Sequence, residues 1–183
     1  CPRTRNTFPQ WDLALVLNYL TQAPFEPLRL ATPKNLTYKT AFLTLLASGS
    51  RCSEIHALEY ESFKFQEDYR FAVMKPIPEF RPKSESARRH VPELIKISAL
   101  APTLERGLKE DRSLCPIRAL RIYKDRTAEL RKGKAMRKLF ISHRKGFQTD
   151  ICKNTFAGWV RKLIKEAYKK STVHTITLSG ARP

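Results

Sequence analysis

Residues 153–169, KNTFAGWVRKLIKEAYK, carry the clearest helical pattern in the chain. Their apolar side chains recur at the spacing of one face of an α-helix, at Phe156, Trp159, Val160, Leu163, Ile164 and Ala167. The other face is basic and holds Lys153, Arg161, Lys162, Lys165 and Lys169. We predict a helix whose apolar stripe joins the core and whose basic face lies in solvent or contacts nucleic acid.

Four further helices are predicted from the same spacing and from local start and stop signals. Residues 11–21 form an amphipathic pattern. Thr32 and Pro33 are typical of a helix start, as a cap and a first-turn proline, and the helix that they begin ends near Gly49. The remaining two are predicted at 51–58 and, with Pro116 in the first turn, at 113–130.

Residues 63–97 show a different pattern, an alternation of period two that is typical of strands. Strands are predicted at 63–66, 70–74 and 91–97, with a short strand or extended segment at 138–142. The prolines between Lys75 and Pro82 indicate a loop or a sheet edge. The sequence therefore predicts an α+β fold, mainly helical, with a small three-stranded antiparallel sheet.

The chain is strongly basic, with 35 Lys and Arg against 17 Asp and Glu and a net charge of +18. Residues 101–183 contribute +14 of that charge, so the positive potential is concentrated in the second half. A hydrophobic content of 42% is that of a globular chain and not of a disordered one. This charge excess favours a nucleic-acid partner, with a basic ribosomal or membrane-surface protein as the alternative.

The cysteines and the hydropathy exclude several other classes. Cys1, Cys52, Cys115 and Cys152 form no Cys-x-x-Cys pair, and no histidine lies at zinc-finger spacing from them. We expect reduced thiols, as in a cytosolic or nuclear protein, and no metal site. No signal peptide and no apolar run of roughly 18 residues is present, so no membrane span is expected.

The segment SRCSEIHAL, residues 50–58, places Arg51 at the start of a helical turn and Glu54 three residues later. An arginine and a glutamate at this spacing ordinarily form a salt bridge on the helix surface. In so basic a chain, an arginine held by a local acid is also a candidate phosphate-binding group. The residues alone leave both interpretations open. His56, in the same turn, is predicted to be a packed or capping histidine.

Taken in order, several segments resemble the catalytic domain of tyrosine recombinases, the phage-integrase superfamily. Residues 50–55 resemble the first arginine box of that family, and residues 173–176, which include His174, are similar to the start of its second box, His-x-x-Arg. The order of two helices, an arginine turn, a sheet with a lysine in its loop and further helices also resembles the family. Finer similarity to the branch carried by DIRS-like retrotransposons lies at 11–13, 24–28, 51–58, 114–120 and 155–168.

The resemblance implies an intact parent that cuts and rejoins DNA through a tyrosine attacking a phosphodiester. Arg51 would clamp the phosphate, Glu54 would orient it or cap the turn, and His174 would assist proton transfer or orient the phosphate. Lys83 would be the general-acid lysine, with Lys75 as its rival. DNA contacts are expected from Arg81, Arg88, Arg89, Arg144, Lys145, Lys153 and Arg161. The expected partners are double-stranded DNA and other recombinase protomers, in the nucleus, and this chemistry needs no metal or cofactor.

The sequence departs from the family at the second box, where Thr177 stands in place of the arginine. A threonine provides neither a charge nor a bidentate fork. No tyrosine follows His174. We therefore expect a basic tail at 1–10 and a partial catalytic domain at 11–183, a fragment that ends before the nucleophile and binds DNA without cleaving it. A non-catalytic remnant that binds DNA or a protein, and a basic RNA-binding protein, are the alternatives.

Other residues that could carry chemistry are predicted to have plainer roles. Tyr123 and Tyr168 lie at or beside helical stripes and are expected to be packing residues. His143, Arg144 and Lys145 are adjacent and are expected to form a basic turn.

Overall fold

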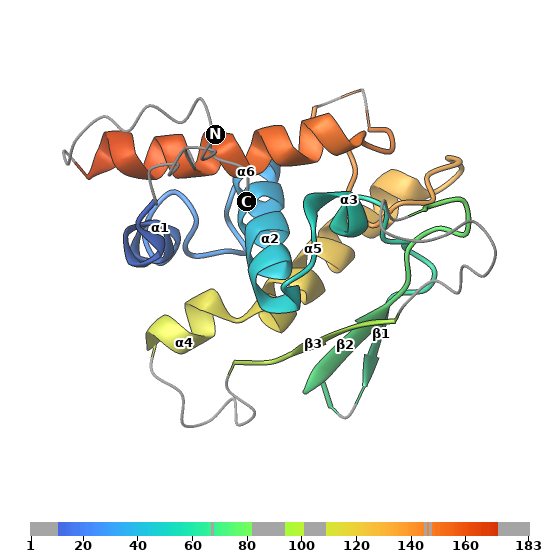
Figure 1. Cartoon of the computed structure of the whole chain (residues 1–183), viewed down its shortest axis with the longest axis horizontal. Helices are drawn as coiled ribbons and strands as arrows, with labels where there is room; N and C mark the ends of the chain where they lie inside the picture. Colours follow the sequence, from blue (N-terminus) through green and yellow to red (C-terminus); the bar gives the residue numbers. More distant parts are fainter. Residues whose placement is uncertain are drawn as a thin grey trace, which may run out of the picture.

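The structure, a computed structural model, describes residues 11–66, 68–81, 94–100, 109–144, 146 and 148–171. Helices make up most of the fold, and a small antiparallel sheet lies at one end of the molecule (Figure 1). The α+β class and the three-stranded antiparallel sheet predicted from the sequence are confirmed. The elements are α1 (Leu13–Leu20), α2 (Pro33–Ser48), α3 (Cys52–Ile55), β1 (Lys64–Gln66), β2 (Phe71–Met74), β3 (Ile95–Ser98), α4 (Lys109–Leu114), α5 (Pro116–Arg131) and α6 (Lys153–Lys170).

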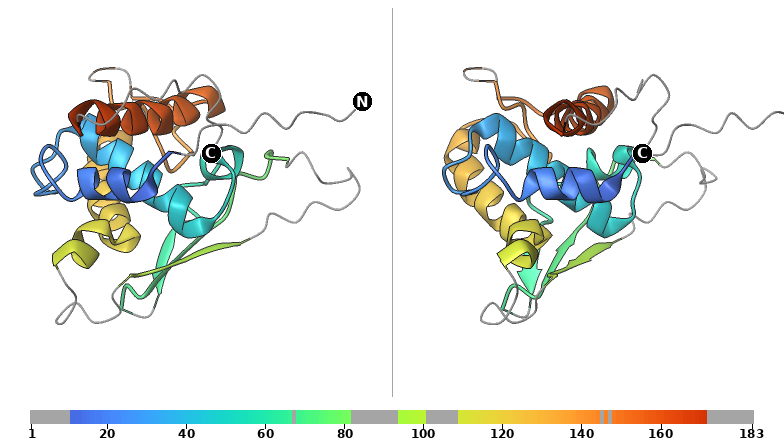
Figure 2. Two further views of the ribbon diagram at one scale, coloured as in Figure 1. Left: turned by 60° about the vertical axis from the view of Figure 1, so that its left-hand side comes forward. Right: turned by 90° about the vertical axis from the view of Figure 1, so that its left-hand side faces the viewer.

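The central element is α2, which packs against α5 and also against α6 (Figure 2). The Thr32 side chain accepts a hydrogen bond from the Asn35 N–H at 3.3 Å, and Pro33 occupies the first turn, as predicted. Gly49 ends the helix with a φ of 62°, a left-handed conformation that glycine adopts with little strain. Every residue from Asn35 to Leu45 is buried, so this helix has no solvent face along most of its length.

The sheet has the order β1-β2-β3, with both pairs antiparallel. Ala72 of β2 lies opposite Phe65 on one side and Ile97 on the other, and both Ala72 and Ile97 are fully buried against the helices. The strands begin one or more residues later than predicted. Residues 91–93 of the predicted third strand lie outside the described part of the chain.

Three extended segments connect α3 to the rest of the core. Residues 57–59 leave α3 and pair with residues 75–77, through Glu59 N–H to Lys75 O and Ile77 N–H to Ala57 O, both at 2.8 Å. On their other side they pair with residues 137–139. Residues 138–142 form only isolated bridges, so the segment is extended chain and not a regular strand. These bonds hold the end of α3 in a fixed position.

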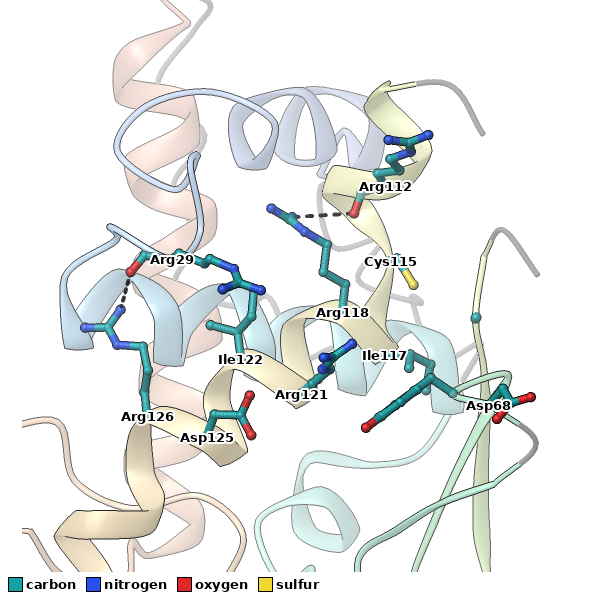
Figure 3. Close-up of a pocket in the computed structure, with 12 residues that line it drawn as sticks. Arg29, Asp68, Arg112, Cys115, Ile117, Arg118, Arg121, Ile122, Asp125 and Arg126 are labelled. Atoms are coloured by element: carbon teal, nitrogen blue, oxygen red, sulfur yellow. Dashed lines mark hydrogen bonds between the residues drawn. The ribbon is translucent and has the colours of Figure 1, made fainter. Parts of the chain in front are cut away.

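The helix α5 has Pro116 in its first turn, as predicted, but begins there and not at residue 113. It buries Ile117, Leu120 and Tyr123 on the side that faces the core. Its outer side carries exposed Arg121 (Figure 3). The short helix α4 precedes it and was not predicted, because its sequence KEDRSL has no apolar period.

The prediction that the apolar stripe of α6 joins the core is confirmed, since all six of its residues are buried. The two tyrosines expected to pack are both bonded to the backbone. The Tyr123 hydroxyl accepts the Ile141 N–H at 3.1 Å, and the Tyr168 hydroxyl accepts the Asp12 N–H. Burial raises the pKa of Tyr123 to about 12, so this residue is a neutral structural group.

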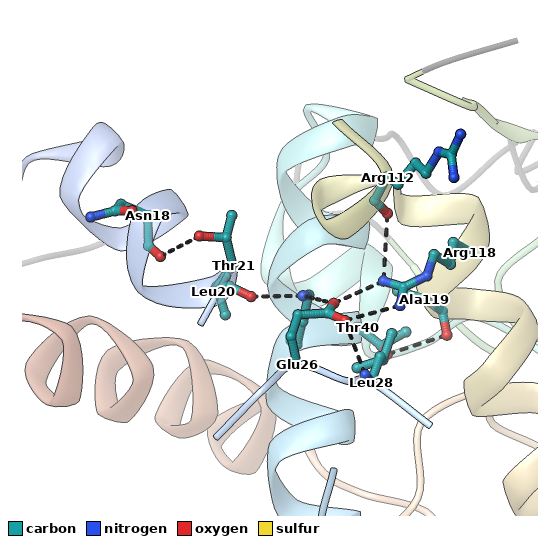
Figure 4. Close-up of polar contacts among 10 residues, drawn as sticks. Asn18, Leu20, Thr21, Glu26, Leu28, Thr40, Arg112, Arg118 and Ala119 are labelled. Atoms are coloured by element: carbon teal, nitrogen blue, oxygen red, sulfur yellow. Dashed lines mark hydrogen bonds and ion pairs between the residues drawn. The ribbon is translucent and has the colours of Figure 1, made fainter. Parts of the chain in front are cut away.

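A buried ionic cluster ties the loop after α1 to α2 and α5 (Figure 4). Lys39 is fully buried, and its Nζ donates to Glu26 Oε1 at 2.6 Å and to the Leu20 carbonyl at 2.7 Å. Arg118 donates to both Glu26 oxygens, at 2.8 and 2.9 Å. Burial alone would raise the pKa of Glu26, but the hydrogen bonds and charges of Arg118 and Lys39 lower it to about 2. The carboxylate is therefore ionised and compensates two cations.

Candidate nucleic-acid interface

Arg51 immediately precedes α3, and Glu54 closes the turn behind it. The Glu54 carboxylate accepts the Arg51 backbone N–H at 2.7 Å, so of its two expected roles Glu54 performs the capping one. The Arg51 side chain is exposed, and within the described part of the chain it makes no ion pair. The surface salt bridge, one of the two interpretations that the spacing left open, is therefore not formed among the described residues. The guanidinium faces solvent and can meet a ligand.

The first half of α6 lies beside α3 and brings more positive charge to Arg51 (Figure 1). Burial raises the pKa of the Cys52 thiol, and the positive charges of Lys153 and Arg161 oppose that rise. Both cations must therefore lie near Cys52, the residue that follows Arg51. We name this surface the α3–α6 face, and it comprises Arg51 and the exposed cations Lys153, Arg161, Lys162, Lys165 and Lys169.

Within the described part of the chain, the cations of the α3–α6 face have no carboxylate partner, unlike Lys34 and Arg137. Lys34 pairs with Glu166 at 2.9 Å, and Arg137 pairs with Glu79 at 2.7 Å and with Glu59 at 3.3 Å. No ion pair between described residues involves a member of the α3–α6 face. Like charges on neighbouring turns repel one another, so this arrangement contributes nothing favourable to folding. It does provide a row of donors for an anion.

The start of α6 adds to the positive potential. Lys153 occupies the first turn, which holds no acidic residue. A helix N-terminus carries partial positive charge, so a lysine there is unfavourable by roughly 0.3–1 kcal/mol. An anion bound at this turn would remove that cost.

A hollow of about 750 Å³ adjoins the first turns of α6. Arg144, Lys162 and Thr155 line it, together with Asp150. Arg144 is exposed, so the structure brings this predicted DNA contact close to the α3–α6 face. Lys153 and Arg161, two other predicted contacts, are members of the face itself.

His143 corrects the prediction of a simple basic turn. Its ring is half-buried between Tyr38 and Trp159, with both ring centroids 5.5 Å from its own. Burial lowers the pKa of His143, and the charges of Lys34 and Arg144 lower it further. The imidazole is therefore a neutral packing group, because the aromatic residues of α2 and α6 enclose it. Lys145 lies outside the described residues.

His56 confirms its predicted packing role and also borders the face. Its Nδ1 lies 2.7 Å from the Ser53 carbonyl, and its ring contacts Phe80 edge-on. Burial lowers the pKa of His56, the bond to Ser53 opposes this, and the charges of Lys138 and Lys153 lower it. The imidazole is therefore neutral, and the positive charge of Lys153 contributes to keeping it so.

The loop between β2 and β3 is described only at its start. Lys75 is exposed, and its backbone pairs with Glu59 beside the chain that leaves α3. Arg81 bends back on its own loop, where Nη1 donates to the Pro78 carbonyl at 2.7 Å and to the Phe80 carbonyl at 3.2 Å. The predicted general-acid lysine Lys83 lies outside the described residues, so the choice between it and Lys75 stays open.

Several further predicted site residues also lie outside the described part of the chain, namely Arg88, Arg89 and His174. Thr177, the residue at the second-box arginine position, lies outside it as well. The convergence of Arg51, Lys83 and His174 on one surface therefore stays a prediction.

Other kinds of site find no support in the described part of the chain. Its residues include no group of three or more His, Cys, Asp or Glu side chains able to hold a metal ion. None of the helices that the structure describes is both long enough and apolar enough to cross a membrane. Comparisons of the chain with protein-family models, curated proteins and solved structures found no match.

Proposed function

We propose that the chain binds double-stranded DNA, with the α3–α6 face against the phosphate backbone. The observation that carries the proposal is that Arg51 lies beside the first half of α6, with Lys153 and Arg161 near Cys52, and that further exposed cations follow along the helix, none with a carboxylate partner among the described residues. Positive charge that does not stabilise the fold is the usual mark of a phosphate-binding surface.

The dimensions of α6 favour an extended polyanion over a small one. The helix has 18 residues and is therefore about 27 Å long, far longer than the site that a single phosphate group occupies. Its exposed cations recur from the first turn to the last, at Lys153, Arg161, Lys165 and Lys169. A free phosphate would meet only one or two of these groups, whereas a duplex lying along the helix would meet most of them.

In this proposal the DNA-binding surface belongs to a tyrosine-recombinase-like domain, and Arg51 holds one phosphate of the bound strand. Support comes from the residues around Arg51 and from the order of elements, in which the arginine turn precedes a three-stranded sheet and two long helices follow. Thr177 cannot replace a second arginine, and loss of one such charged group typically costs several kcal/mol of transition-state stabilisation. We therefore expect the chain to bind DNA without cleaving it.

Binding is tested with a fluorescent 30-base-pair duplex, by anisotropy at about 0.1 M salt. The variant Lys153→Glu/Arg161→Glu should weaken binding about tenfold or more, because two phosphate contacts become repulsions. The matched control Lys64→Glu/Lys96→Glu makes the same charge change on exposed residues of the sheet, at the other end of the molecule, and should weaken binding far less. Equal loss in both variants would contradict binding through the α3–α6 face.

Two further assays separate this proposal from its alternatives. A duplex carrying a suicide nick should give no covalent adduct with the chain, and an adduct would refute the expectation of binding without cleavage. A structured RNA of equal length should bind more weakly than the duplex at matched salt. Equal affinity would favour the RNA-binding alternative.

A further inference from the structure

A groove of about 450 Å³ runs along the outer side of α5, away from the α3–α6 face. Because α2 packs between α5 and α6, the two surfaces lie on different sides of the molecule (Figure 2). The floor of the groove is largely apolar and includes Ile117, Ile122 and Cys115, with Tyr69 and Ala99 from the sheet side. The rim is rich in arginine, with five arginines and two aspartates among the lining residues.

The rim arginines divide into two groups by what they already bind. Arg118 is bound to Glu26, and Arg126 donates to the Ala31 carbonyl at 2.6 Å. Both of these cations are therefore parts of the fold. They fix the shape of the groove and cannot turn toward a ligand without breaking those bonds.

The other rim arginines have no carboxylate partner among the described residues. Arg121 lies over the ring of Tyr69, with its guanidinium carbon 4.6 Å from the centroid, which holds the side chain in place but leaves its N–H groups available. Arg29 is exposed and extends toward α5 in Figure 3. Arg112, also exposed, stands at the outer end of the groove. Arg29 and Arg121 thus place two forks beside the apolar floor.

We propose that this groove binds an acidic peptide segment of a partner protein, with an apolar side chain on the floor and carboxylates on the rim. A pocket of this volume accommodates one or two apolar side chains, and their burial supplies affinity. The planar forks of Arg29 and Arg121 match carboxylates bidentately. Duplex DNA fits poorly, because its convex surface presents phosphates and no apolar group that could fill the floor.

This inference goes beyond DNA binding, because it concerns a second partner on a separate surface. A chain that uses both surfaces could hold DNA and a partner protein together. An acidic segment is attracted to a chain of net charge +18, whereas a basic partner would be repelled by it.

The test uses a fluorescein-labelled eight-residue peptide of alternating glutamate and leucine, titrated with the chain and followed by anisotropy. We expect saturable binding that the exchange Arg121→Glu weakens about tenfold or more. The matched control Lys165→Glu makes the same charge change on the α3–α6 face and should leave the peptide affinity within about twofold. An all-glutamate peptide should bind about tenfold more weakly, because nothing fills the floor.

Four results would overturn the proposal. They are the absence of saturable binding, equal loss in Arg121→Glu and Lys165→Glu, equal affinity for the all-glutamate peptide, and displacement of the peptide by excess 30-base-pair duplex. Thermal unfolding of Arg121→Glu is measured in parallel. If that variant proves unfolded, Arg29→Glu replaces it, since Arg29 is exposed on a loop and its side chain makes no ion pair among the described residues.

Discussion

Two groups of cations in this chain occupy opposite environments. Around Glu26, Lys39 and Arg118 lie within hydrogen-bonding distance of one carboxylate, and Lys39 has no solvent contact. On the α3–α6 face, six cations are exposed, and none has a carboxylate partner among the described residues. The cations that give the chain its net charge of +18 therefore have different roles. Some of its cations stabilise the fold, and others remain available for a partner.

The two groups should respond to mutation in opposite ways. Removing Glu26 leaves a buried lysine and a half-buried arginine without compensation, so the fold should suffer. Removing a cation from the α3–α6 face relieves repulsion, so the fold should be unaffected or slightly more stable while DNA affinity falls.

The largest effect is expected at Glu26. The exchange Glu26→Gln should lower the free energy of unfolding by about 3–5 kcal/mol, because Lys39 stays buried without its counter-charge. Urea denaturation measures this value. The matched control is Glu166→Gln, which breaks the more exposed pair with Lys34 and should cost less than about 1 kcal/mol. Similar losses in the two variants would show that the Glu26 cluster is no more important than a surface pair.

The same carboxylate predicts an acid-sensitive component of stability. Its pKa is lowered to about 2 in the folded chain, below the value of an unfolded glutamate, so its contribution is complete above about pH 4.5. That contribution should be lost as the pH falls from about 4.5 toward 2. In urea titrations, the stability difference between the wild type and Glu26→Gln should shrink over that interval. A constant difference across the interval would be inconsistent with an ionised Glu26 in the fold.

The sequence predicted a helix well where one of its faces lies in solvent and less well where none does. The apolar stripe of α6 indicated both its buried side and its basic side correctly, because the two faces have different environments. By contrast α2 is buried along most of its length, and only Thr32, Pro33 and Gly49 indicated where it begins and ends. The short helix α4 has neither signal and was missed.

The candidate site was predicted in its parts and not in its arrangement. The exposure of Lys153 and Arg161 followed from the α6 stripe, but their nearness to Arg51 depends on how α3 packs beside α6. The Glu26 cluster joins residues 92 positions apart, which no local pattern could indicate. His143 was misjudged for the same reason, since the Tyr38 and Trp159 rings that enclose it come from other segments.

A smaller effect is expected from Arg51 alone. The exchange Arg51→Ala should weaken duplex binding about three- to tenfold, because one charge-assisted phosphate contact is lost. Its free energy of unfolding should stay within about 0.5 kcal/mol of the wild type, since the Glu54 cap bonds to the Arg51 backbone and not to its side chain. Arg51→Lys should recover part of the affinity. A large loss of stability with unchanged DNA affinity would reverse the role assigned to Arg51.

The smallest effect concerns two thiols near the face. Cys152 is exposed and its pKa is lowered by a hydrogen bond with the Thr155 hydroxyl, whereas burial raises the pKa of Cys52. Iodoacetamide should therefore modify Cys152 faster than Cys52 at about pH 7.5, as measured by mass spectrometry of the labelled peptides. Bound duplex should slow the reaction of Cys152. An unchanged rate would indicate that DNA does not cover the start of α6.

The central claim is that the cations of the α3–α6 face, which have no carboxylate partner among the described residues, bind DNA phosphates. The salt dependence of duplex affinity tests it most directly. Each phosphate contact contributes a slope of about −0.9 to the logarithm of the association constant against the logarithm of salt concentration. The variant Lys153→Glu/Arg161→Glu/Lys165→Glu should therefore reduce the magnitude of that slope by roughly 2 to 3 relative to the wild type. Its urea unfolding curve should not move to lower concentration. An unchanged slope in a folded variant would contradict the claim.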